Sequence, residues 1–451
     1  MPKVIKIKRG LDINLKGKAE KLLVAAGRSQ TVAVKPPDFM GLTPKLLVKP
    51  EQKVKVGTPL FFDKYKPSVL FVSPVAGTVV SVNRGERRRI LEVVVSATGA
   101  EEYEPLLKGD PGSMEATAIK NQILKSGLWP CIIQRPYGVI ANPDDQPVAL
   151  FVSCFDTAPL APDYEFLLKD DADAFSTGIA ALRKMAGCKV HLGVEGERLP
   201  KPFAGLNDVE YHHFSGPHPA GNVGVQIHHV QPLNKGNVVW TLSPQHVVLI
   251  GKTFIKGHLD PTLTVAVAGP MVNKPRYIKT LIGTSLVPVL ADLLAEGGQG
   301  ARVISGNVLT GTRVDTDGYL GFYDSLISVI PEGDHYELFG WALPGIGKFS
   351  NSRTFFSWLT PKKEFVMDSN LNGGHRAFVM SGQYDKVLPM DIMPVHLLKS
   401  ILVDDIDKME QLGIYEVVEE DLALCEFVCT SKMEVQSILR RGLDLVRKEM
   451  S

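Results

Sequence analysis

The chain has 451 residues, enough for about three or four domains of ordinary size. Its formal charge is +1, from 50 Lys and Arg against 49 Asp and Glu, so no global charge attracts it to nucleic acid or to anionic lipid. No apolar run approaches the ~20 residues of a membrane-spanning helix, so we expect any membrane association to be peripheral. Five scattered cysteines and an N-terminus without a signal peptide's apolar core predict a cytoplasmic protein.

Residues 1–100 show the pattern of short strands and Gly-containing turns that is typical of a barrel-sandwich domain of the biotinyl or lipoyl carrier kind. The runs 54–61 (VKVGTPLF) and 69–80 (VLFVSPVAGTVV) carry this pattern. Lys64 and Lys66 lie near the tip where carrier domains present a modifiable lysine, but neither has the right spacing and context. We therefore expect an unmodified barrel that serves as a structural module.

Residues 101–258 alternate between strand and helix patterns, which predicts a Rossmann-like α/β domain with a parallel sheet. Residues 148–153 (VALFVS) and 189–194 form apolar strands, with a helix over 175–186 between them. Ligands of such sheets bind beyond the carboxyl ends of the strands, where residues 154–160 (CFDTAPL) are expected. No G-x-G-x-x-G turn, the phosphate-binding signature of dinucleotide sites, occurs there.

The last third of the chain divides into three parts. Residues 259–335 combine a strand, a turn, a helix from Gly283 to Leu294 and a further strand, which suggests a β-grasp domain. Residues 336–390 carry β-like segments and are expected to form a β-rich connection. Residues 391–451 are expected to form a helical domain, with helices over 394–412, 419–429 and 433–449.

Histidines gather in the α/β region and raise the question of a metal site. They are His212, His213, His218, His228, His229 and His246. Adjacent histidines on a strand point to opposite faces, and no acidic or cysteine ligand stands at a supporting spacing, so no bound metal is expected. His218 stands apart, because the turn 216–221 (GPHPAG) is rigid and can aim its imidazole at a quinone carbonyl.

Several motifs together give the chain its family resemblance. They are 54–57 (VKVG), 73–77 (SPVAG), 82–85 (VNRG), 126–129 (SGLW), 215–221 (SGPHPAG), 304–311 (ISGNVLTG), 338–341 (LFGW) and 419–429 (EEDLALCEFVC). On these residues the whole chain resembles the A subunits of bacterial sodium-translocating NADH:quinone oxidoreductases. The resemblance implies a peripheral protein on the cytoplasmic side of the inner membrane, within a six-subunit complex that reduces ubiquinone and exports sodium. It also implies an SLBB-like identity for the β-grasp domain and membrane contact only through the partner subunits.

The architecture is more distantly similar to the flavin subunit of respiratory complex I and to the C subunit of Rnf complexes. Where those proteins have a Gly-rich flavin loop, this chain has 127–131 (GLWPC), whose bulky side chains would block a phosphate. Only Cys425 and Cys429 remain of the cysteine set for iron–sulfur clusters, which normally needs four thiolates. The comparison implies that this chain binds no cofactor and that flavins and iron–sulfur clusters belong to other subunits.

Two roles remain open at this point. In the first, the empty cleft binds a ubiquinone headgroup and is lined by Trp129, Phe155, Asp156 and His218, with His229 outside it on a strand. In the second, the chain is a docking protein that braces the membrane subunits and performs no chemistry. A free-standing NADH dehydrogenase is disfavoured by the missing Gly-rich loop.

Overall fold

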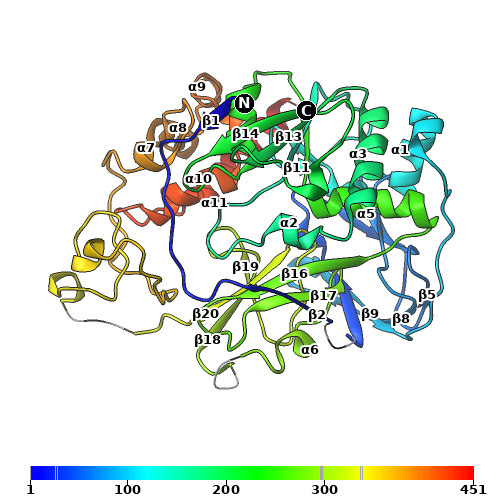
Figure 1. Cartoon of the computed structure of the whole chain (residues 1–451), viewed down its shortest axis with the longest axis horizontal. Helices are drawn as coiled ribbons and strands as arrows, with labels where there is room; N and C mark the ends of the chain where they lie inside the picture. Colours follow the sequence, from blue (N-terminus) through cyan, green and yellow to red (C-terminus); the bar gives the residue numbers. More distant parts are fainter. Residues whose placement is uncertain are drawn as a thin grey trace.

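A computed structural model of the chain describes residues 2–25, 27, 29–294, 298–335, 337 and 339–450. Two mixed sheets, a small two-sheet barrel and a group of C-terminal helices make up the described part (Figure 1). Residue 338, the first of the motif at 338–341, lies outside the described residues. None of the described helices combines the length and apolarity needed to cross a bilayer.

The barrel-sandwich domain is present, and it begins near residue 31. Its sheets are β3 (Thr31–Val34), β9 (Ile90–Ala97), β8 (Gly77–Arg84) and β5 (Lys53–Val54), facing β4 (Pro44–Leu46), β6 (Pro59–Asp63) and β7 (Leu70–Val72). Alternating apolar residues such as Leu60 and Val79 fill the space between the sheets and are fully buried. Lys66, in the β6–β7 turn, points its Nζ towards the Ile140 carbonyl oxygen of the next domain, 3.4 Å away.

The first 25 residues do not belong to the barrel. β1 (Val4–Lys6) pairs in parallel with β14 (Glu210–Ser215) and forms the edge of the α/β sheet, while β2 (Glu20–Ala25) pairs with β17 of the third domain. The N-terminal segment thus connects two domains that lie far along the chain.

The second domain is the expected α/β unit, built on a seven-stranded sheet in the order β1-β14-β13-β12-β15-β10-β11. Its further strands are β10 (Ile133–Arg135), β11 (Val139–Ile140), β12 (Ala149–Ser153), β13 (Lys189–Glu195) and β15 (Val239–Leu242). β12, β13, β14 and β15 run in parallel, as the apolar runs predict, whereas β10 and β11 form an antiparallel hairpin at the far edge.

Alternate residues of β12 define what covers each face of this sheet. Leu150 and Val152 face the larger core, which contains α3 (Ala172–Ala186) and α5 (Pro244–Lys256). Phe151 faces the other side and packs with Ile227 of α4 (Val223–Val230). The remaining helices of the domain are α1 (Ala116–Lys125) and the single turn α2 (Tyr164–Leu167).

The third domain is a six-stranded sheet in the order β19-β18-β20-β16-β17-β2, in agreement with the β-grasp assignment. Its own strands are β16 (Thr262–Ala268), β17 (Arg276–Leu281), β18 (Ala301–Ser305), β19 (Thr312–Val314) and β20 (Leu326–Pro331). The helix expected from Gly283 to Leu294 is shorter: α6 covers only Val287–Leu290 and is followed by turns.

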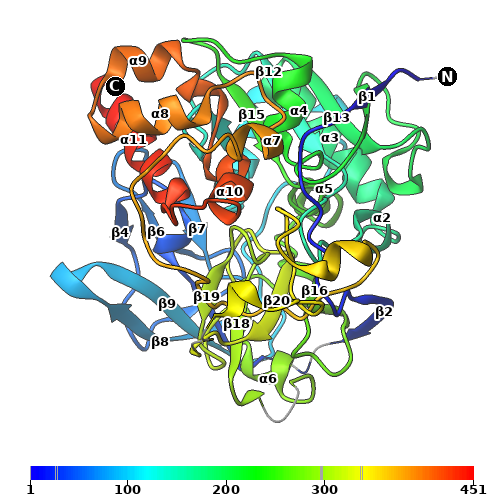
Figure 2. The ribbon, with the colours of Figure 1, turned by 90° about the vertical axis from the view of Figure 1, so that its left-hand side faces the viewer.

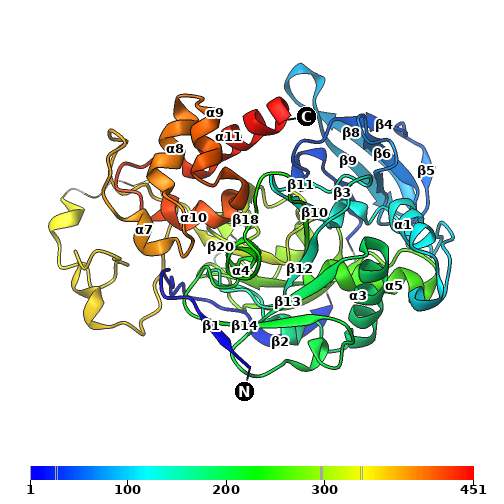
Figure 3. The ribbon, with the colours of Figure 1, turned by 90° about the horizontal axis from the view of Figure 1, so that it is seen from above.

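The expectation of a β-rich connection over 336–390 requires correction. Among its described residues there is no strand; it contains the 3-10 turns η7 (Gly340–Ala342) and η8 (Phe356–Leu359) and the short helix α7 (Tyr384–Val387). Closely spaced prolines and glycines, such as Pro344, Gly345 and Pro361, interrupt any ladder. Much of the segment projects from the body of the molecule (Figure 3).

The C-terminal region is helical as expected, with α8 (Pro394–Leu402), α9 (Ile406–Gln411), α10 (Glu419–Phe427) and α11 (Val435–Met450). One expected helix is divided in two, because Asp404 adopts a left-handed φ of 56° that ends α8. Leu397, Leu422 and Leu439 form a second core with Ile7 and other residues of the α/β domain. Figure 2 shows these helices against the α/β sheet.

A buried ion pair joins the C-terminal helices to the sheet. Arg135, at the end of β10, contacts Asp421 of α10 at 2.6 Å between Nη1 and Oδ2, and its Nη2 contacts Glu420. Only 3% of the Arg135 side chain is exposed and none of Asp421. Asp421 also accepts a hydrogen bond from the Val418 amide at the start of α10, so one carboxylate caps the helix and binds the sheet.

Candidate functional site

The segment after β12 and the turn that contains His218 lie against each other. Thr157 Oγ1 accepts a hydrogen bond from the Gly221 amide at 3.0 Å and lies 3.1 Å from His218 Nδ1. A Cβ on Gly221 would approach the Thr157 nitrogen to 2.7 Å, so the close approach requires glycine. The structure thus brings Phe155, Asp156 and His218 into one region at the carboxyl end of the parallel strands.

Hydrogen bonding indicates which His218 nitrogen carries the proton. Because the Thr157 hydroxyl already accepts from Gly221, its own proton can be donated to His218 Nδ1. This arrangement leaves Nε2–H as a donor. Burial lowers the pKa of His218 to about 4, so the ring is neutral at pH 7. Burial raises the pKa of Asp156, although its carboxylate accepts the Ala158 amide at 2.8 Å.

Trp129 is placed elsewhere. Its indole is fully buried in the larger core, donates from Nε1 to the Ala141 carbonyl oxygen at 2.9 Å and packs edge-on against Trp240 with 5.6 Å between ring centroids. Phe155 belongs instead to the second core, beside Phe214 and the C-terminal helices. The bulk of Trp129 therefore fills protein interior rather than lining the region around His218.

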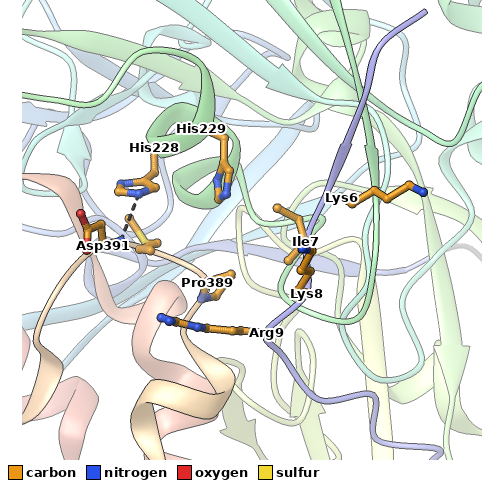
Figure 4. A pocket seen from close by; sticks show the side chains of 9 residues that line it. Lys6, Ile7, Lys8, Arg9, His228, His229, Pro389 and Asp391 are labelled. Carbon is orange, nitrogen blue, oxygen red and sulfur yellow. Dashed lines mark hydrogen bonds between the residues drawn. The ribbon is translucent and has the colours of Figure 1, made fainter.

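A cavity of about 320 Å³ lies next to the His218 turn, and we call it the β1 cavity (Figure 4). Its lining combines the end of β1, the end of α4 and the segment before α8: Lys6, Ile7, Lys8, Arg9, His228, His229, Pro389, Met390 and Asp391. The turn and the cavity share a wall, because the Leu11 amide donates to the His218 carbonyl oxygen and the Ile7 amide to Ser215, each at 2.8 Å.

The two histidines of the β1 cavity lie on helix α4, so the expectation that His229 continues a strand is wrong. His228 uses both nitrogens: Nδ1 lies 2.7 Å from Glu416 Oε2, and Nε2 accepts the Asp391 amide at 3.1 Å (Figure 4). His229 donates from Nδ1 to the Val225 carbonyl oxygen at 2.9 Å. Burial lowers the pKa of His229, so its Nε2 is a hydrogen-bond acceptor at neutral pH.

Sequence reasoning missed a histidine and carboxylate cluster on the same sheet. His191 of β13 lies opposite Glu210 of β14, and His212 follows two residues later on the same face of the strand. The ligand atoms of all three lie within 4.8 Å of one another. The expectation that no acidic residue supports the histidines is therefore wrong. The spacing Glu-x-His in a strand was the available signal, but His191 comes from another strand.

The two remaining cysteines of the supposed cluster motif have structural partners. Cys425 and Cys429 are both buried, and the Tyr384 hydroxyl lies 2.9 Å from Cys429 Sγ. Burial raises the pKa of the Cys425 thiol, which keeps it protonated and disfavours thiolate ligation.

Comparison with known proteins identifies the family. The NqrA N-terminal barrel-sandwich hybrid domain matches residues 5–98, the NqrA second alpha/beta domain matches 114–259, and the NQRA C-terminal domain, an SLBB domain, matches 264–316. Among solved structures, an air-oxidized NAD+-reducing [NiFe]-hydrogenase covers 74% of this chain and 61% of its own, with 12% identity and a TM-score of 0.38. A likeness that weak carries no argument.

Curated relatives match along the full length. The NqrA protein of the Na(+)-translocating NADH-quinone reductase from Photorhabdus laumondii is 39% identical over 450 residues, covering 99% of this chain and 100% of the relative. The proteins of the same name from Rhodopirellula baltica and Neisseria gonorrhoeae are 38% and 37% identical and also cover 99% of this chain. The chain therefore belongs to the NqrA family, the A subunits of Na(+)-translocating NADH-quinone reductases.

Proposed function

We propose that this chain contributes to the quinone-reduction half of a sodium-translocating NADH:quinone reductase by binding a quinone headgroup without a redox cofactor of its own. Family membership supports the role as a subunit of that complex. In this proposal the chain sits peripherally on the cytoplasmic side, and the flavins and iron–sulfur clusters belong to its partner subunits.

The observation that carries the proposal is the chemistry that meets at the β1 cavity. A quinone carbonyl requires hydrogen-bond donors, and Lys6, Lys8 and Arg9 line the cavity. The hydroxyl of the reduced quinol requires an acceptor, and His229 Nε2 is one. Ile7 and Met390 offer apolar surface for the ring, and the volume reaches the lower end of the range for small-molecule sites.

His218 remains part of this proposal as the second donor. Its Nε2–H suits a quinone carbonyl, as the sequence suggested, and its carbonyl oxygen fixes the chain that forms the cavity wall. Phe155 and Asp156 lie beside it and would support the turn, whereas Trp129 would act only through the core. His218 is only 3% exposed, so direct contact with a quinone requires a small outward movement of the turn.

Titration of the full chain with a short-chain ubiquinone, observed by ligand NMR, tests the proposal. We expect saturable 1:1 binding that His229→Ala weakens by a few-fold to about tenfold, the value of one hydrogen bond. His218→Ala should weaken binding at least as much if Nε2 contacts the quinone, and His375→Ala on an exposed segment serves as the control. Absence of saturable binding would refute the proposal and leave the docking role.

A docking role is supported independently by exposed apolar side chains in the projecting segment. Phe356, Trp358, Leu359 and Met380 are each about half exposed or more, with exposures of 57%, 48%, 62% and 60%. Apolar surface of this kind commonly marks a protein interface. The double variant Phe356→Ser/Leu359→Ser should weaken co-purification with the other subunits and leave quinone affinity unchanged; unchanged assembly would contradict this role.

A further inference from the structure

The cluster of His191, Glu210 and His212 is independent of the β1 cavity chemistry and is built by strand register. His191 pairs with Glu210 across β13 and β14, which places both side chains on one face of the sheet. His212 shares that face because side chains alternate along a strand. His191 Nδ1 lies 2.9 Å from His212 Nε2 and 3.5 Å from Glu210 Oε2.

These distances are close to those of a metal coordination sphere. Ligand atoms bound tetrahedrally at 2.0–2.1 Å from a zinc ion lie roughly 3.3 Å apart. The carboxylate oxygen is already near this separation from His191, and the two imidazole nitrogens need only move apart by a few tenths of an ångström. Two histidines and one glutamate are also a ligand set that zinc uses when one coordination position stays open.

The protein fixes His191 and leaves its polar atoms poorly satisfied. The ring stacks on Phe151 with 4.5 Å between centroids and is only 3% exposed. Its Nε2 is buried without a hydrogen-bond partner among the described residues. Nδ1 points at a second imidazole, so the only contact available without a metal is one N–H···N bond. A buried imidazole held in this way is unexpected in a purely structural position.

The ionisation states suit metal binding at neutral pH. Burial lowers the pKa of His191 to about 4 and also lowers the pKa of His212, so both rings are neutral. The hydrogen bond from Lys189 lowers the pKa of Glu210, which is therefore a carboxylate. A cation would displace few protons on entering. Lys189 holds Glu210 Oε1 at 2.7 Å and acts as the competing cation, but its side chain is 73% exposed and can move away.

An entry path is present on the side of His212. This residue lines a second cavity, of about 440 Å³, together with Ile5, Tyr211 and His213. The cavity gives a metal ion access to the cluster and room for a water or other ligand in the fourth position.

We propose that His191, Glu210 and His212 form a binding site for a divalent transition metal ion with the preferences of Zn²⁺, open on one side to the second cavity. The metal site does not depend on the chain binding quinone. The site belongs to the α/β domain alone, because all three ligands come from β13 and β14.

The test uses the full chain after treatment with a chelator, titrated with Zn²⁺ by calorimetry and with Co²⁺ by visible absorption. We expect one ion per chain and the intense visible bands of four-coordinate Co²⁺. His212→Gln and Glu210→Gln, whose side chains are only partly buried, should each weaken binding at least tenfold. His213→Gln, on the opposite face of the same strand, is the matched control and should bind normally.

Lys189→Ala separates loss of the site from loss of folding, because it predicts a gain. Removing the competing ammonium frees Glu210 and reduces repulsion of the cation, so Zn²⁺ should bind several-fold more tightly. Absence of stoichiometric binding would overturn the proposal, as would affinities that are the same in His212→Gln, Glu210→Gln and the unmodified chain.

Discussion

Removing the charge of Arg135 should release the C-terminal helices from the α/β sheet. The guanidinium and Asp421 are almost completely buried, and the closest contact between them is 2.6 Å. In Arg135→Met a side chain of similar length keeps the packing but leaves the Asp421 carboxylate without its cation. Breaking a buried pair from one side costs about 3–5 kcal/mol, which raises the local opening equilibrium by roughly 100- to 4,000-fold.

Hydrogen exchange of the α10 amides measures this opening directly, because parts of a multidomain chain open separately. Arg441→Met is the matched control: its partner is Asp404, and both side chains are about half exposed, so we expect a change of only about 0–1 kcal/mol. Adding Asp421→Asn to Arg135→Met should recover part of the loss, since no ionised carboxylate remains at that position. Equal exchange in Arg135→Met and Arg441→Met would refute the reasoning.

Three further predictions concern acid stability, helix packing and modification. Because the fold lowers the pKa of His218 from 6.5 to about 4, its stabilisation is complete above pH 6.5 and is lost as the pH falls to 4, by up to about 3 kcal/mol; His218→Gln should flatten this part of the urea-midpoint profile, and an unchanged slope would contradict it. Gly251→Ala would place a Cβ 1.8 Å from the Ala174 carbonyl oxygen where α3 and α5 cross, so urea denaturation should show a loss of about 1–3 kcal/mol rather than none. Chain isolated from its native complex should show the intact mass of the unmodified 49.3 kDa polypeptide and no flavin absorption band, whereas added mass on Lys66 would disprove the structural role of the barrel.

The elements that sequence predicted best are those with an unbroken local pattern. The hairpins at 54–80 and the apolar run at 148–153 indicated the barrel and the parallel sheet, because alternation and continuous burial are written into neighbouring residues. The helices after residue 391 followed for the same reason. By contrast, β1 and β2 are short strands whose partners lie about 200 residues or more away, and no local signal assigns them to other domains.

The candidate site was only partly predictable. The position of His218 followed from its Pro-flanked turn and from the carboxyl end of β12. His229 was misplaced because the run Ile227-His228-His229-Val230 reads equally well as a strand, while in the fold it ends helix α4. The β1 cavity and the His191 cluster depend on contacts between distant segments, which residue spacing along one strand does not reveal.

The most direct test of the central claim is steady-state quinone reduction by the assembled complex that carries His229→Ala in this chain, with His375→Ala as the control. We predict that the KM for ubiquinone rises by a few-fold to about tenfold in His229→Ala and stays unchanged in the control. A complex with His229→Ala whose KM for ubiquinone equals that of the unmodified enzyme would contradict quinone binding at the β1 cavity.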